Sequence, residues 1–283
     1  MPVRIAILDL YDGEPNEGMR AIRELIADQD RVLGGGVFEF DVFDVRVRGE
    51  VPGLDHDIYL SSGGPGSPFS GEGKRWEADY FACVDDIWNH NERLPADSAS
   101  RKHLLFICHS FQMMCRFFAL ARVVKRRSEA FGIFATEQTE AGRRDPLFDG
   151  LPDPFFAADF RGWQVVQPSD IVLAEFGGTV LAIEKERPHI PLERALMAIR
   201  ISPEIVGVQF HPEADPSGMT LHFSKPDRKR HVIRHHGEDK YNRILRHMGD
   251  ENFLKRTHDA VVPNFLRQAV DSLRPEDVAA GPG

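Results

Sequence analysis

The sequence predicts an α/β fold, with a mainly parallel, open β-sheet that carries helices on both faces and is extended by a short β meander. The first part of the chain alternates apolar, strand-like runs with longer segments whose apolar residues recur at helical spacing. This βαβα order is typical of parallel sheets that are covered on both faces. From about residue 123, short β-rich runs instead follow one another, separated by Pro, Gly and Asp.

The alternating part begins with a strand and contains three helical segments. In chain order its segments are VRIAILDL, GMRAIRELIAD, VFEFDVFDV, DIYLSS, RWEADYFACVDDIWNHNERL, HLLFICHS and FQMMCRFFALA. The short apolar runs suit buried strands, and the longer periodic segments suit helices that cover them. In such a sheet, functional groups gather at the carboxyl ends of the strands.

The second part is predicted to add a meander to the same sheet. Its β-rich runs are RVVK, GIFA, WQVVQ, IVLAEF, TVLAIE, ALMAIRI and IVGVQF. An amphipathic helix over HDAVVPNFLRQAVDSL then closes the fold. We predict an α/β domain at 1–215, a basic, His-rich insertion at 216–258, the closing helix at 259–276 and a loose tail at 277–283.

Composition and charge narrow the function classes. The chain has 283 residues and is 42% hydrophobic, which is enough for a full core, and its net charge of -9 gives no general attraction to nucleic acid or anionic lipid. No secretory leader is visible, and no apolar run reaches the roughly 18 residues of a membrane span. Three cysteines are too few and too unevenly placed for a disulfide framework or a zinc site. We expect a cytoplasmic protein with a small-molecule substrate, with no nucleic-acid or membrane partner and no cofactor.

The stretch FICHSFQMM places Cys108 between a strand-like run and a helical segment. A strand that ends at Ile107 would present the thiol at the carboxyl edge of the sheet. The free N–H groups and the dipole of the following helix would favour thiolate over thiol. A buried packing role is the alternative for this cysteine taken alone.

Two further stretches could complete a site around Cys108. IVGVQFHPEAD ends a β run in His211, with Glu213 two residues later on the same side of an extended chain. A cysteine nucleophile needs a base that can protonate the leaving group, and that imidazole needs a carboxylate to orient it. In YLSSGGPGSPFSGE, the N–H of Gly64 could join that of His109 in a two-donor oxyanion hole. Taken singly, both stretches are also compatible with ordinary turns.

The order S-G-G-P, C-x-x-x-Q and G-x-Q-F-H-P-E resembles the class I (triad) glutamine amidotransferase domain, of the kind found in GMP synthase. The resemblance spans roughly Val3 to Asp215, and N264-F265-L266 resembles the helix that ends those domains. It implies a flavodoxin-like fold and these roles: Cys108 as nucleophile, His211 as general base, Glu213 as its orienter, Gly64 and His109 as oxyanion donors, and Gln112 as a contact to glutamine. It further implies glutamine hydrolysis through a γ-glutamyl thioester. Because no ATP-binding synthetase segment is visible, we expect any ammonia-accepting synthetase to be a separate partner.

The sequence departs from the family pattern at two places near the expected site. The family elbow reads G-x-C-x-G-x-Q, but Phe106 and Ser110 replace both glycines here, so we expect a less tight elbow. In DFRGWQVVQP the usual histidine or serine is also replaced. We predict substrate contacts from Arg161, which could pair with a carboxylate, and from Trp163. The donor is therefore glutamine or a related γ-glutamyl compound.

The insertion is the third departure. Its basic part, Lys225 to His247, could dock an acidic partner, cover the site or bind phosphate. His231 and His235 are four residues apart, but nothing completes a ligand set, so we expect a solvated amphipathic helix and no metal. Three functions stay open: an amidotransferase, a γ-glutamyl hydrolase acting on a γ-glutamyl amine or peptide, and a non-catalytic binding subunit.

Overall fold

A computed structural model describes residues 1–14, 16–188, 191–250 and 253–274. Within these residues one sheet of nine strands has the order β2-β1-β3-β4-β9-β8-β7-β5-β6. The strands are β1 (Val3–Asp9), β2 (Phe38–Asp44), β3 (Ile58–Ser61), β4 (His103–Ile107), β5 (Ala121–Gln138), β6 (Phe155–Pro168), β7 (Thr179–Glu184), β8 (Leu196–Arg200) and β9 (Ile205–Val208). The helices are α1 (Gly18–Val32), α2 (Arg75–Glu92), α3 (His109–Phe117), α4 (Asp170–Phe176), α5 (Pro216–Ser224), α6 (Pro226–His236), α7 (Glu238–Met248) and α8 (Leu254–Leu273), with 3-10 turns at Gly142–Arg144 and Pro146–Phe148.

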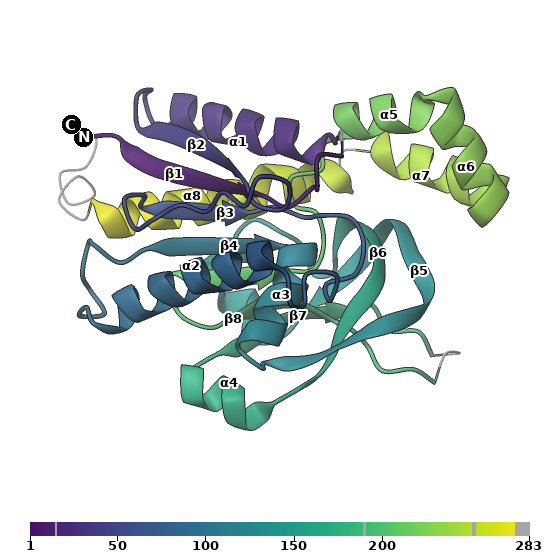
Figure 1. The fold of residues 1–283 in the computed structure, drawn as a ribbon. Coiled ribbons are helices and arrows are strands. Elements are labelled where there is room, and N and C mark those ends of the chain that lie inside the picture. Colours follow the sequence, from purple (N-terminus) through teal and green to yellow (C-terminus); the bar gives the residue numbers. More distant parts are fainter. Residues whose placement is uncertain (15, 189–190, 251–252, 275–283) are drawn as a thin grey trace.

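The sheet has a parallel part and an antiparallel part. The pairs β2-β1, β1-β3, β3-β4 and β4-β9 are parallel. The strands beyond β9 pair antiparallel out to the long β5-β6 hairpin. Helices α1 and α8 cover one face of the parallel part, while α2 and α3 cover the other (Figure 1). The predicted α/β fold with an added meander is confirmed.

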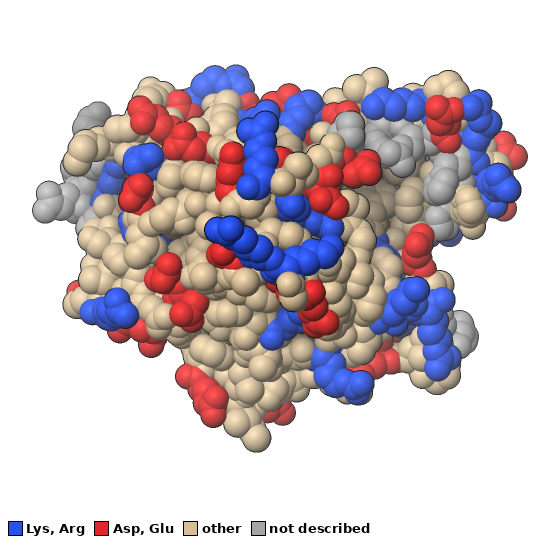
Figure 2. Space-filling model, viewed as in Figure 1, with Lys and Arg blue, Asp and Glu red and all other residues tan. Residues whose placement is uncertain are grey.

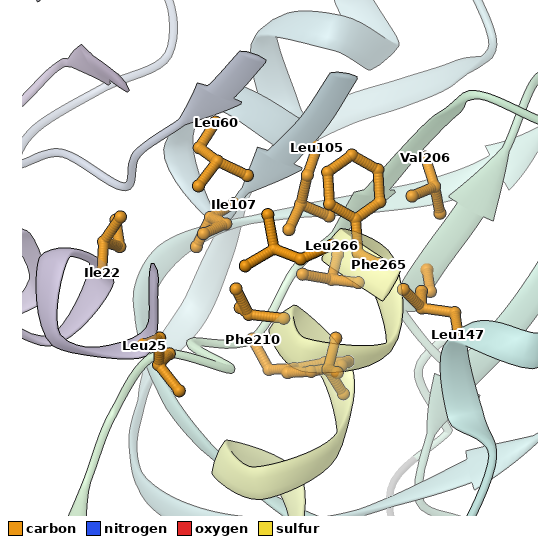
Figure 3. Close-up of a cluster of buried hydrophobic side chains, with 14 of the residues drawn as sticks. Ile22, Leu25, Leu60, Leu105, Ile107, Leu147, Val206, Phe210, Phe265 and Leu266 are labelled. Atoms are coloured by element: carbon orange, nitrogen blue, oxygen red, sulfur yellow. The ribbon is translucent and has the colours of Figure 1, made fainter. Parts of the chain in front are cut away.

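Alternation along the central strands divides the core into two apolar layers. Leu105 and Ile107 of β4 face the cluster beneath α1 and α8, to which α8 contributes Phe265 and Leu266 (Figure 3). Phe106, between Leu105 and Ile107, faces the second cluster, beneath α2 and α3. Both faces of β4 are buried, as expected for a strand in the middle of a parallel sheet.

The run IVLAEF was wrongly predicted as a strand, because it lies in helix α4. The Ser169 hydroxyl accepts the N–H of Val172 and caps the start of the helix, while Gly177 ends it in a left-handed conformation with φ 68°. These caps outweigh the β preference of Ile171 and Val172.

The segment after residue 215 forms helices α5, α6 and α7, which pack against the β5-β6 hairpin (Figure 1). Helix α8 begins at Leu254, a few residues before the start expected from the sequence. The predicted tail at 277–283 and the His231 side chain lie outside the described residues. Within the described part of the chain, no helix is both long and apolar enough to cross a membrane, and no group of three potential ligands could hold a metal ion.

Buried histidines give the fold a predictable response to acid. Burial lowers the pKa of His103 to about 4, helped by Arg200 and Arg101 against the opposing effect of Glu204. The unfolded chain therefore binds a proton near pH 6.5 that the folded chain rejects, so stability is lost as the pH falls from about 6.5 toward 4. We measure the free energy of unfolding with urea at pH 7, 6 and 5. As the pH falls, we expect it to decrease less steeply in His103→Asn than in the parent protein. Equal slopes in the two proteins would contradict this assignment.

Candidate active site

Four neighbouring parallel strands bring the predicted site together at one edge of the sheet. Tyr11 follows β1, Gly64 follows β3, Cys108 follows β4 and His211 follows β9. Because β1, β3, β4 and β9 are adjacent and parallel, their carboxyl ends meet at the same edge. Residues separated by about two hundred positions are thereby placed around one point.

Cys108 occupies a sharp turn between β4 and α3. Its backbone has φ 50° and ψ -96°, which is unfavourable for a residue with a side chain. The Cys108 N–H donates to the Val208 carbonyl at 2.8 Å, which fixes the turn against β9. The loosening expected from the replaced glycines is therefore not seen.

Phe106 and Ser110, which replace those glycines, have defined neighbours on the strands beside β4. Phe106 of β4 lies opposite Gly207 of β9, and a side chain at Gly207 would come within 2.6 Å of Phe111. The absence of a side chain at Gly207 thus leaves room for Phe111 and Met114 of α3. The Ser110 hydroxyl accepts the Ile107 N–H at 2.8 Å and donates to the Ser61 carbonyl at 2.8 Å, so it ties the elbow to the end of β3.

Removing the Ser110 hydroxyl should loosen the elbow. Ser110→Ala leaves the buried Ile107 N–H and Ser61 carbonyl without this partner, so we expect a loss of about 1–3 kcal/mol in the free energy of unfolding. Ser100→Ala, at an exposed position, is the matched control and should change it by less than about 0.5 kcal/mol. Urea denaturation measures both, and equal stabilities would show that the hydroxyl does not stabilise the turn.

His211 and Glu213 form a close pair beside the thiol. His211 Nδ1 lies 2.8 Å from Glu213 Oε1, and the His211 N–H donates to the Ala158 carbonyl of β6 at 2.8 Å. Burial lowers the pKa of His211, but the neighbouring Cys108 and Glu213 outweigh burial and raise it well above its ordinary value. The site therefore favours an imidazolium at His211. Glu213 is only 1% exposed, so water has little access to this carboxylate.

The predicted oxyanion donors lie at the same edge of the sheet, since Gly64 is in the loop after β3 and His109 directly follows Cys108. Neither N–H donates to an acceptor among the described residues. A side chain at Gly64 would come within 2.3 Å of the Leu10 carbonyl, so only glycine fits here. Arg46 donates to the carbonyls of Leu10 and Pro65, at 3.2 and 2.8 Å, and holds the glycine loop against the end of β1.

Gln112 and Trp163, two of the predicted substrate contacts, already contact other protein groups. Gln112 is buried and donates to the Trp163 carbonyl at 3.4 Å and to Gln209 Oε1 at 3.2 Å. The Trp163 ring lies 5.2 Å from that of Phe69, in the loop after β3. Gln112 and Trp163 are therefore near the elbow and the glycine loop, but their protein contacts leave a substrate role as a prediction.

Arg161 has no freedom to take a substrate carboxylate in this arrangement. Its side chain is 1% exposed, and its Nε donates to both oxygens of Asp159, at 2.8 and 3.0 Å. The substrate contact predicted for Arg161 has no support in this geometry. The sequence could have indicated this ion pair, because Asp159 and Arg161 are residues i and i+2 of a strand and therefore share a face.

Sequence reasoning missed three residues at the site. Gln209 Nε2 lies 3.7 Å from Cys108 Sγ, within the motif that supplied His211. Nothing in the sequence marks Arg46, and only its hydrogen bonds to the glycine loop show that it belongs to the site. Burial, then Glu213 and Cys108, raise the pKa of Tyr11 well above its ordinary value, so its hydroxyl stays protonated beside the pair. The position of Tyr11 directly after a buried strand could have indicated it.

A pocket of about 420 Å³ opens onto this cluster, and Gly64 and His211 both line it. Aromatic rings of Phe131, Phe160 and Phe223 form one wall. Its carboxylates are Glu14, Glu17, Glu213 and Asp215, and no Lys or Arg is among the described residues that line it. The pocket is therefore apolar on one side, while on the other Arg20 pairs with Glu17 and Asp215, and His211 pairs with Glu213.

The fold and the site define a class, an open-sheet α/β protein with a cysteine elbow and a His–Glu pair at the carboxyl edge of the sheet. A family model described as glutamine amidotransferase class-I matches residues 44–226. This is more than half of the chain, which therefore belongs to the class-I glutamine amidotransferase family, and the resemblance seen in the sequence is confirmed. A search of curated proteins found no match.

Solved structures resemble the whole fold. A glutamine amidotransferase from Thermotoga maritima shares 16% identity with a TM-score of 0.68, covering 96% of this chain and 99% of that one. A putative GMP synthase component from Thermoplasma acidophilum shares 15% with a TM-score of 0.54, covering 100% and 99%. The glutaminase domain of CTPS from Trypanosoma brucei with bound acivicin shares 14% with a TM-score of 0.53, covering 75% and 86%. At these identities the likeness shows the fold alone.

The remaining two cysteines, Cys83 and Cys115, are expected to be unreactive. Burial raises the pKa of Cys83 to about 12, with a further contribution from Asp86, and burial raises the pKa of Cys115 well above its ordinary value. Both are therefore thiols at neutral pH within the apolar core. We expect Cys83→Ala and Cys115→Ala to keep hydrolytic activity within a few-fold of the parent protein. Loss of turnover in either folded variant would identify a different nucleophile.

Proposed function

We propose that this protein hydrolyses the side-chain amide of glutamine with Cys108, His211 and Glu213 as its catalytic triad, and supplies ammonia to a separate acceptor enzyme. The observation that carries the proposal is the 2.8 Å His211–Glu213 contact beside a cysteine on a strained elbow. A nucleophile, a base and an orienting carboxylate are the three groups that this chemistry needs. Their joint presence weighs against a non-catalytic binding role.

In the proposed reaction, the Cys108 thiolate attacks the side-chain carbonyl carbon of glutamine. The N–H groups of Gly64 and His109 stabilise the oxyanion, and the His211 imidazolium protonates the amide nitrogen. The C–N bond breaks, so ammonia leaves and a γ-glutamyl thioester remains on Cys108. His211 then takes a proton from water, whose oxygen attacks the thioester, and glutamate leaves as the thiolate is restored.

The pocket supports a second candidate, a γ-glutamyl hydrolase that releases an amine instead of ammonia. Its aromatic wall would accommodate an apolar amine, whereas ammonia needs no such space. The triad and the thioester would be the same in both reactions. This candidate requires no separate acceptor enzyme.

Comparing donors distinguishes the two candidates. Initial rates of ammonia release from glutamine and of amine release from γ-glutamyl amides are measured, with Cys108→Ala as the blank. A higher kcat/KM for glutamine supports the amidotransferase, and a higher value for a substituted amide supports the hydrolase. Absence of turnover with every donor in the folded protein would overturn both.

A cytoplasmic site of action remains a prediction from cysteine usage and composition.

A further inference from the structure

A second cavity, of about 480 Å³, lies between helix α7 and strand β5. It shares no lining residue with the pocket at the triad. Gly132 to Ala135 of β5 and Phe156 of β6 form one side, Lys185 follows β7, and α7 closes the other side. Helix α7 and the end of β5 lie next to each other at the margin of the molecule (Figure 1).

The side chains that α7 presents to this cavity are basic. Lys240, Arg243 and His247 stand at positions i, i+3 and i+7, so they follow one face of the helix. Burial lowers the pKa of His247, so Lys240 and Arg243 supply the positive charges of this face. Lys185 joins them from the loop after β7. Among the described residues, no Asp or Glu lines the cavity, and Lys185, Lys240 and Arg243 make no ion pair. In Figure 2, basic side chains lie over the insertion and over the neighbouring lower margin of the same face.

The cavity has rigid walls around these charges. Lys240 Nζ lies 4.6 Å and Lys185 Nζ 5.6 Å from the centre of the Phe134 ring, so both cations share one aromatic floor. Ile244 is buried between α7 and β5 and anchors the helix. Gly132 has φ 143°, a backbone conformation that residues with a side chain rarely adopt, so this point of β5 favours glycine.

Uncompensated like charges in one cavity raise its energy until an anion neutralises them. The site combines a fork-shaped guanidinium, which can grip two oxygens, with ammonium groups that act as point charges, a combination suited to phosphate. Burial, followed by the repulsion of Arg243 and Lys185, lowers the pKa of Lys240, in agreement with a site that lacks its counter-ion.

We propose that the groove formed by Lys185, Lys240, Arg243 and His247 over Phe134 binds a small phosphate-bearing anion. The basic insertion then binds phosphate, one of the three roles left open by its sequence. Helix α5 of the same insertion contributes Met219 and Phe223 to the triad pocket, so a bound anion would hold the insertion against β5 next to that pocket. The proposal does not depend on the reaction at Cys108.

Isothermal titration calorimetry of the full chain tests this proposal, with inorganic pyrophosphate and a nucleoside monophosphate as separate probes. We expect saturable one-to-one binding of at least one probe, weakened at least tenfold in Lys240→Gln/Arg243→Gln. Arg246→Gln removes one positive charge from α7 outside the cavity and should change the affinity less than twofold. If the nucleotide binds more tightly, its nucleoside group also contacts the cavity, as expected for an aromatic floor. If pyrophosphate binds more tightly, the cavity recognises phosphate groups alone.

Lys185→Gln lies outside the helix and tests the same groove independently of the folding of α7. We expect it to weaken binding at least threefold. Absence of saturable binding by both probes, or equal affinity in the groove variants and the parent protein, would overturn the proposal. Binding of a polyglutamate peptide without binding of either phosphate probe would also overturn it and would point to an acidic protein partner.

Discussion

Cys108→Ala is expected to lower the turnover of glutamine or a γ-glutamyl amide by at least about 10³-fold, because no thioester can form without the thiol. The fold should persist, since the side chain is small and Ser110 and the Val208 carbonyl still hold the turn. Steady-state kinetics on the purified variant measures the loss, and its far-UV circular dichroism and melting temperature verify folding.

Cys115→Ala is the matched control for this experiment, because it removes a buried thiol from the same helical segment outside the elbow. It should retain activity within a few-fold. Substantial turnover by Cys108→Ala would remove Cys108 from the mechanism, whatever the control shows.

His211→Ala is expected to reduce turnover to a similar extent, because the same imidazole protonates the leaving nitrogen and activates water. The raised pKa of His211 indicates an imidazolium next to Cys108, and a neighbouring positive charge makes a cysteine more reactive. The variant should therefore lose a second property, the rapid reaction of Cys108 with iodoacetamide at pH 7. Kinetics of alkylation, followed by mass spectrometry, measures it without any substrate.

His90→Ala, on α2 and outside the site, is the control for removal of a histidine. It should alter neither turnover nor alkylation. Unchanged alkylation in His211→Ala would show that the imidazole does not support the thiolate, and retained turnover would exclude it as the base.

Local motifs predicted the cluster of Cys108, His211 and Glu213, because Cys108 directly follows β4 and the other two residues lie shortly after β9, and short apolar runs made both strands visible. The chain order of strands and helices then implied that these strand ends share one edge. Neither inference needed a side-chain contact. The chemical roles of the three residues remain proposals.

The features that the sequence could not reveal depend on contacts between distant elements. Gly207 lies opposite Phe106 and leaves room for Phe111 of α3, which depends on the register of β4 and β9 and on the packing of α3. The cap at Ser169 converts an apolar, β-like run into α4. Arg46 holds the glycine loop from the loop after β2, and no local pattern marks it. Such effects appear only when the register and the packing of the elements are known.

Covalent labelling with a diazo-ketone analogue of glutamine tests the central claim most directly, because it requires neither an acceptor enzyme nor turnover. The modified residue is mapped by mass spectrometry, with and without excess glutamine. We predict modification confined to Cys108, slowed by glutamine and lost in His211→Ala. Modification of Cys83 or Cys115 instead, or no modification of the folded protein, would contradict the assignment of Cys108 as the nucleophile of a glutamine site.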